Sequence, residues 1–68
     1  MKTFKIGECC IGGIVKAELK NNVYRIQIVD WYTKGVIKDK QFNNRSAALY
    51  FLEDMSTHYW ADKIISKL

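Results

Sequence analysis

The feature that most constrains this fold is a pair of alternating segments joined by Asn21 and Asn22. Residues 14–20 read IVKAELK and residues 23–29 read VYRIQIV. Asparagine tolerates the positive φ that a two-residue hairpin turn demands. The resulting register separates an apolar face from a polar face, and a slip of one residue would mix the two. The apolar face holds Val15, Ala17, Leu19, Tyr24, Ile26 and Ile28.

A third strand is expected to follow this hairpin. A three-residue loop that ends in glycine predicts a strand over residues 36–42, in a register that places Ile26 opposite Phe42. Lys38 and Lys40 then fall on the inner face. Lysine is common on exposed edge strands, where its stem lies along apolar surface and its ammonium group reaches water. We therefore expect a short, polar edge strand.

The segment before the hairpin predicts a first strand and a tight turn. Phe4 and Ile6 alternate with lysine, which indicates a strand that pairs with residues 14–20. The glycine pair at 12–13 suits the turn between the two strands, and Gly7 suits a bulge. No helix and no Lys-Ser/Thr pair follows these glycines, so they do not form a phosphate-binding loop.

The remainder of the chain predicts helix. Asn44 or Ser46 would cap its start, and apolar residues recur at positions 48, 52, 55 and 59, the spacing of one helical face. Residues 56–57 interrupt this pattern, which favours two short helices over one bent helix. The fold class is therefore α+β: a four-stranded, mostly antiparallel meander sheet, followed by one bent or two short C-terminal helices packed on one face.

The cysteines and the histidine do not form a recognisable site. Cys9 and Cys10 are adjacent, so in a strand their side chains point to opposite faces, whereas zinc sites space their thiolates. His58 is the only histidine, and no nucleophile or paired carboxylate lies at a recognisable spacing from it. We expect no metal, no cofactor, no catalytic residue and no enzymatic activity.

Composition sets the remaining expectations. The 68 residues suffice for one domain, 1–68, and a chain this small buries only about 60% of its unfolded surface. Residues 1–7 carry no long apolar run, and no segment approaches the roughly 20 apolar residues that span a bilayer. A cytoplasmic protein without membrane association is expected. The net charge of +4 includes lysines that never form a run, which favours a role in solubility over phosphate binding.

An apolar cluster on the outer face of the sheet is the strongest functional candidate. The registers place Ile14 opposite Val29 and Trp31 opposite Ile37, on the face that helices should leave open. A contiguous patch centred on tryptophan is typical of an interface. We therefore expect a protein partner, or a second copy in a homodimer, unless another segment covers the patch. The expected contacts are Ile14, Val29, Trp31 and Ile37, with Arg25 and Lys38 at the rim.

The same face suggests an alternative role. Aromatic and basic side chains on a sheet can stack single-stranded bases and contact phosphates. Lys16, Lys20, Arg25 and Trp31 are the candidates for such nucleic-acid contacts. No ribonucleoprotein-type aromatic motif and no GxxG clamp accompanies them.

The segment VYRIQIVDWYTKGVIKDKQFNNRSAALYFLEDM resembles a short β-meander followed by helix in some anti-CRISPR inhibitors, which are small accessory proteins of phages and mobile elements. The resemblance covers about half of the chain and is one of pattern. It implies a non-enzymatic protein that binds and blocks a host complex. This basic chain differs from the strongly acidic inhibitors that mimic DNA.

Overall fold

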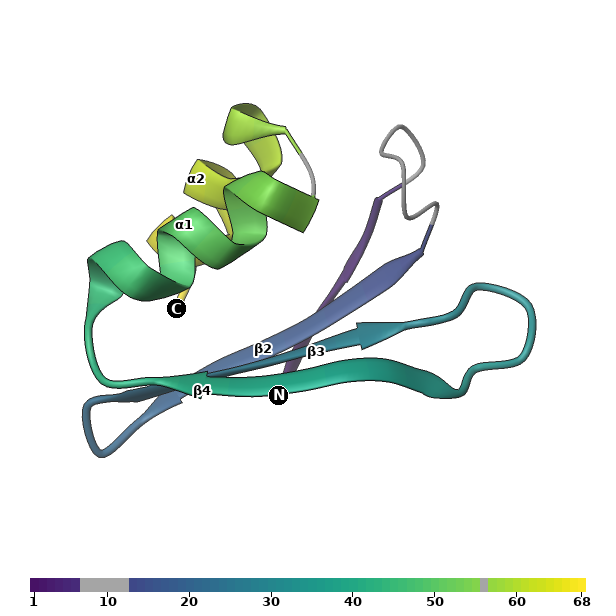
Figure 1. Ribbon diagram of the computed structural model, residues 1–68, viewed down its shortest axis with the longest axis horizontal. Helices are drawn as coiled ribbons and strands as arrows, with labels where there is room; N and C mark the ends of the chain where they lie inside the picture. The colour runs from purple at the N-terminus through teal and green to yellow at the C-terminus, as the bar shows by residue number, and fades with distance from the viewer. Residues whose placement is uncertain (7–12, 56) are drawn as a thin grey trace.

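Four strands and two helices follow one another in the order ββββαα. The computed structural model describes residues 1–6, 13–55 and 57–68. The strands form one antiparallel sheet in chain order, and both helices cover the same face of it (Figure 1). We call this face the helix side and the opposite face the open side. The elements are β1 Lys2–Lys5, β2 Ile14–Lys20, β3 Val23–Val29, β4 Val36–Phe42, α1 Arg45–Met55 and α2 His58–Ser66.

The β2–β3 hairpin has the predicted register throughout. Asn21 and Asn22 have φ values of 53° and 62°, the left-handed conformation that a two-residue turn needs. The pairs run from Lys20 opposite Val23 to Ile14 opposite Val29. Alternation therefore directs the predicted apolar residues to the helix side. Leu19, beside the turn, remains 41% exposed because it lies at the end of the sheet.

The register between β3 and β4 differs from the prediction. Ile26 faces Lys40, two residues before the expected Phe42, and Phe42 faces Tyr24. The reason is the loop, which begins at Asp30 rather than Thr33 because β3 ends at Val29. A register shift between Ile28 and Val29 accompanies the longer loop. Because the register differs from the prediction by two residues, the side chains of residues 38–42 still lie on their predicted faces of the sheet.

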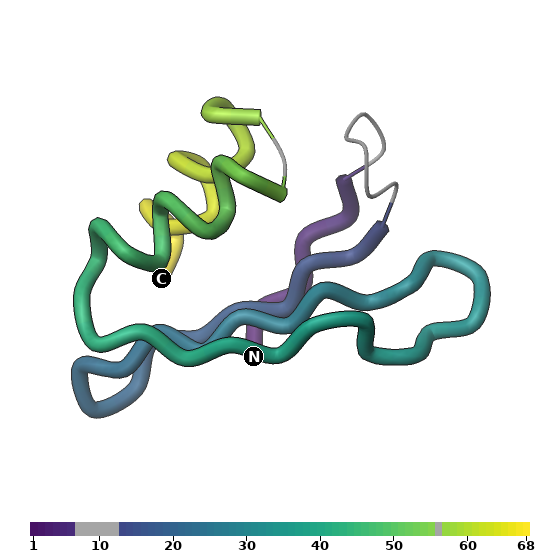
Figure 2. Tube along the Cα trace, in the orientation of Figure 1, coloured from purple at the N-terminus to yellow at the C-terminus, as the bar shows by residue number. Residues whose placement is uncertain are grey.

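Two separate helices follow the sheet, as the sequence pattern favoured. The Asn44 side chain caps α1, since its Oδ1 accepts the Ala47 N–H at 2.7 Å. The Thr57 side chain caps α2 and accepts the Trp60 N–H at 3.4 Å. The two helices pack against each other and lie above the sheet (Figures 1 and 2). Within the described residues, neither helix is long and apolar enough to cross a membrane.

One hydrophobic core lies between the sheet and the helices. Its strand members project from the helix side, and its helix members come from the facing sides of α1 and α2. The Ile6 N–H donates to the Gly13 carbonyl at 3.0 Å, which continues the β1–β2 pairing. The expected bulge at Gly7 and the predictions for Cys9 and Cys10 lie outside the described residues. The core consists of Ile6, Val15, Ala17, Ile26, Ile28, Ala48, Leu52, Ala61, Ile64 and Ile65.

Candidate protein-interaction surface

The predicted apolar patch on the open side is only partly exposed. Ile14 and Val29, expected at its centre, are buried, with exposed fractions of 7% and 3%. They lie outside the main core cluster, in agreement with their position on the open side. The prediction that these two side chains are available for contact is therefore wrong.

Ile14 and Val29 occupy the inner positions of a row of paired residues. Cross-strand pairing arranges Lys5, Ile14, Val29 and Val36 as one row across all four strands. Val36, at the end of the row, is 55% exposed. The apolar surface is therefore displaced towards the β3–β4 loop.

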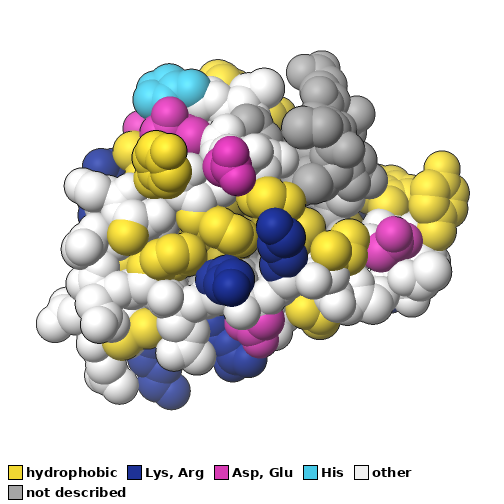
Figure 3. Space-filling view, in the orientation of Figure 1, with side chains coloured by type: hydrophobic (Ala, Val, Ile, Leu, Met, Phe, Trp, Pro, Cys, Tyr) yellow, Lys and Arg dark blue, Asp and Glu magenta, His cyan; other side chains and the backbone are white. Residues whose placement is uncertain are grey.

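The exposed apolar side chains gather at the end of the β3–β4 hairpin. Trp31 is 40% exposed, Tyr32 89% and Ile37 53%. With Val36 they form a surface that we call the hairpin tip. The hairpin extends beyond the other elements in Figure 1, and Figure 3 shows hydrophobic side chains at that end of the molecule. Trp31 does not pair with Ile37 as predicted, because it belongs to the loop rather than to β3.

Asp30 organises the loop that carries the tip. Its Oδ1 accepts the N–H groups of Tyr32 at 2.8 Å and Thr33 at 2.9 Å. These two hydrogen bonds stabilise the charged carboxylate and hold the pKa of Asp30 below its usual value. The Asp30 backbone closes the same loop, with its N–H bonded to Gly35 O at 2.9 Å and its carbonyl to Lys34 N at 3.0 Å. Asp30 is therefore hydrogen-bonded both to the centre of the loop and to its last residues.

Lys34 supports Trp31 from within the loop. Its φ of 63° is left-handed, which lets the chain return into β4. Its Nζ donates to the Trp31 carbonyl at 2.7 Å and lies 5.3 Å from the centre of the Trp31 ring. That distance is within the range of a cation–π interaction. The tryptophan is thus held by its own loop.

The two predicted rim residues lie on opposite sides of the sheet. Arg25 is on the open side, whereas Lys38 pairs with Ile28 and lies on the helix side, where its Nζ is 3.8 Å from the Met55 sulfur. A single rim that includes both is therefore excluded. Strand alternation separates them, since Ile28 belongs to the core face.

Arg25 belongs to a polar network on the open side. Its guanidinium holds the Asp39 carboxylate with two hydrogen bonds, of 3.3 and 2.9 Å, and Gln27 donates to the same carboxylate at 3.1 Å. The Arg25 and Gln27 hydrogen bonds lower the pKa of Asp39, and the Asp39 hydrogen bond raises the pKa of Arg25. The charge of Arg25 is therefore largely compensated.

The candidate nucleic-acid contacts are brought together only in part. Lys16, Lys20 and Arg25 share the open side, but Glu18 lies directly opposite Arg25. Trp31 stands in the loop, outside this strand surface. The basic and aromatic groups therefore do not form one continuous stacking platform on the sheet.

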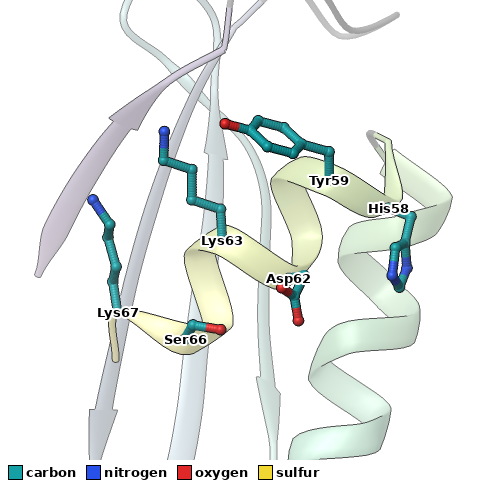
Figure 4. Close-up of a pocket in the computed structure, with 6 residues that line it drawn as sticks. All are labelled: His58, Tyr59, Asp62, Lys63, Ser66 and Lys67. Carbon is teal, nitrogen blue, oxygen red and sulfur yellow. The ribbon is translucent and has the colours of Figure 1, made fainter.

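An open hollow lies over α2. Figure 4 shows Tyr59 and Lys63 side by side, while His58 points away from them. His58 Nδ1 instead lies 3.4 Å from Glu53 Oε2 and connects the two helices. In the part of the chain that the structure describes, no group of three His, Cys, Asp or Glu residues could hold a metal ion.

Sequence reasoning missed Tyr32 and Val36 as members of the tip. The signal was the order Asp-Trp-Tyr-Thr-Lys-Gly, because an aspartate that starts a loop accepts backbone N–H groups two and three residues later. Recognising this turn at Asp30 would have moved both aromatic residues from strand to loop.

Comparison with protein-family models, curated proteins and solved structures gave no match.

Proposed function

We propose that this chain is a small non-enzymatic binding protein that acts in the cytoplasm through protein–protein contact at the hairpin tip. One observation supports this most strongly: Trp31 and Tyr32 are exposed on a projecting loop that is closed by hydrogen bonds from Asp30.

The chemistry of the tip suits a protein contact. Tryptophan and tyrosine are the side chains that most often dominate binding energy at interfaces, because they bury a large area and retain a polar group. Val36 and Ile37 extend this area with aliphatic surface, each more than half exposed. Exposing four such side chains together stabilises no fold, which favours a role in contact.

The order of the loop supports the same proposal. Binding is weakened by the entropy lost when loops and side chains become fixed at the interface. Here Asp30 and Lys34 already restrain the loop backbone, and the Lys34 ammonium lies against the Trp31 ring. A partner would therefore lose less entropy by fixing this loop and the Trp31 side chain.

The inhibitor role belongs to this proposal. The pattern-level resemblance to anti-CRISPR proteins suggests a partner within a host complex that the bound chain would block. Self-association through the tip is the other use of the same surface, and a measurement of mass in solution separates the two.

Partner capture with matched charge substitutions tests the proposal. Trp31→Glu places a charge in the tip, whereas Tyr50→Glu places one on α1 at a tyrosine that is 77% exposed. We expect Trp31→Glu to abolish capture of the protein that wild type retains from the native cell, and Tyr50→Glu to keep it. Sedimentation and circular dichroism show whether each variant is monomeric and folded. Retained capture by folded Trp31→Glu would overturn the proposal, as would unfolding by this substitution.

A further inference from the structure

We infer that β4 is a docking edge for an extended acidic segment of a protein partner, which would join the sheet as a fifth strand. This inference rests on the proposed function, because it names the chemistry of a protein partner. It uses the side of β4, however, and not the hairpin tip.

The edge is open along its length. β4 is the last strand of the sheet, and residues 36–41 are all exposed. It spans seven residues, whereas β1 at the other edge has four. Figure 1 draws β4 nearest the viewer, and Figure 3 shows basic side chains over the same region. An edge of this length leaves backbone groups available to another strand.

The pairing pattern identifies the available backbone groups. The Asp30 N–H bonds to Gly35 O across the hairpin, so the even-numbered residues that precede it in β3 direct their backbone groups towards β4. Their partners, Lys38 and Lys40, use their own backbone groups within the sheet. The alternate residues, Asp39 and Gln41, therefore direct N–H and C=O groups outwards.

The charges of the edge select an acidic partner. Lys38 and Lys40 are exposed on the helix side, and among the described residues neither is paired with a carboxylate. Asp39, on the open side, is held by Arg25. The edge therefore presents two uncompensated positive charges on one side only. An antiparallel strand bonded to Asp39 and Gln41 would oppose the lysines in the closer, non-hydrogen-bonded pairs, where opposite charges stabilise pairing.

A second copy of this chain does not fit the charged part of the edge, residues 38–40. Two-fold antiparallel pairing of β4 places one residue opposite its own copy. A centre at Lys38 or Lys40 opposes two lysines, and a centre at Asp39 opposes two carboxylates. Like charges directly opposite one another destabilise a strand pair. The same lysines that oppose these self-paired registers would therefore accept a strand with glutamate at alternate positions.

Amide hydrogen exchange with a short capped peptide that alternates Glu and Thr tests the inference. At saturating peptide we expect exchange of the Asp39 and Gln41 amides to slow by about tenfold or more, since they would become hydrogen-bonded. A matched peptide that alternates Lys and Thr is expected to leave both rates unchanged. Unchanged rates with the Glu peptide, or equal slowing with both peptides, would overturn the inference.

Charge reversal locates the effect on the edge. The pair Lys38→Glu and Lys40→Glu is expected to abolish the slowing, whereas Lys5→Glu and Lys20→Glu make the same charge change on the open side and should retain it. Persistence of the slowing after reversal at 38 and 40 would contradict the assignment.

Two further variants make the result independent of folding defects and of the tip. Gln41→Pro removes the outward N–H without removing one that bonds to β3, and is expected to weaken peptide binding. Trp31→Glu should leave the peptide effect intact. Loss of the effect in Trp31→Glu would contradict a separate edge, whereas loss of partner capture alone would concern only the tip.

Discussion

The Asp30 carboxylate accepts the Tyr32 N–H at 2.8 Å, so the first residue of the loop also restrains the backbone of the most exposed aromatic residue of the hairpin tip. The hydrogen bond that stabilises the loop therefore lies within the proposed binding surface. A side chain that stabilises the loop thereby prepares the contact surface.

Removing the Asp30 carboxylate should loosen the tip. In Asp30→Ala the Tyr32 and Thr33 amides lose their acceptor, so we expect both to exchange with solvent faster than in wild type. The matched variant Asp62→Ala removes an exposed carboxylate from α2 and should leave these amides unchanged. Amide exchange measured by NMR decides the matter, and unaltered rates in Asp30→Ala would show that the loop is held by other groups.

The loop should also depend on pH in the acidic range. The folded pKa of Asp30 is below its ordinary value of 3.8, so its contribution to stability is complete above that value. The contribution is lost as the pH falls from about 3.8 through the lower folded pKa. We expect the Tyr32 amide signal to titrate within this window. In Asp30→Asn, which cannot ionise, that titration should be absent, and a surviving titration would assign it to another carboxyl group.

The turn between β2 and β3 should tolerate glycine at position 22 and be destabilised by a β-branched residue there. Asn22 has a φ of 62°, which costs an ordinary L-residue about 1–2 kcal/mol. Asn22→Val should therefore lower the free energy of unfolding by roughly that amount, while Asn22→Gly should keep it close to wild type. Denaturant unfolding measures both. Equal stability of the two variants would mean that the turn does not need a left-handed residue.

Shortening a buried side chain of α1 should destabilise the core strongly. Leu52 is fully buried between the helices and the sheet, so Leu52→Ala should cost about 2–5 kcal/mol of unfolding free energy. Leu19→Ala truncates a leucine that is 41% exposed and should cost less. Thermal or denaturant unfolding compares them. A larger loss at Leu19 would place the main core elsewhere.

The alternative role in nucleic-acid binding predicts a specific salt response. Contacts from Lys16 and Lys20 to phosphates would release counterions, so affinity for a single-stranded oligonucleotide should fall steeply as salt rises. Lys16→Gln with Lys20→Gln should then reduce both affinity and the salt slope. Fluorescence anisotropy at low salt provides the measurement. Absence of binding there would eliminate this role.

The sequence predicted the elements well where two constraints agreed. The alternation of residues 14–20 and 23–29 and the Asn21-Asn22 turn require the same register, and the structure has it. The break between the two helices likewise coincides with capping residues, and Thr57 caps α2. Each of these features depends on residues that are close together in the sequence, so it can be predicted from one sequence.

The loop and the patch were harder to predict because they depend on contacts across strands. Glycine at 35 suggested a short loop, but the Asp30 side chain extends it and displaces the β4 register by two residues. Alternation correctly placed Ile14 and Val29 on the open side. Alternation predicts the face of a side chain but not its exposed fraction, so their burial was missed.

Photo-crosslinking from position 32 tests the central claim most directly. A benzophenone amino acid at Tyr32, in the native cell, should form a discrete covalent adduct with one protein, and Trp31→Glu should remove that adduct. The same group at Tyr50 should form none. Absence of an adduct from position 32, or an equal adduct from position 50, would contradict the assignment of the hairpin tip as the contact surface.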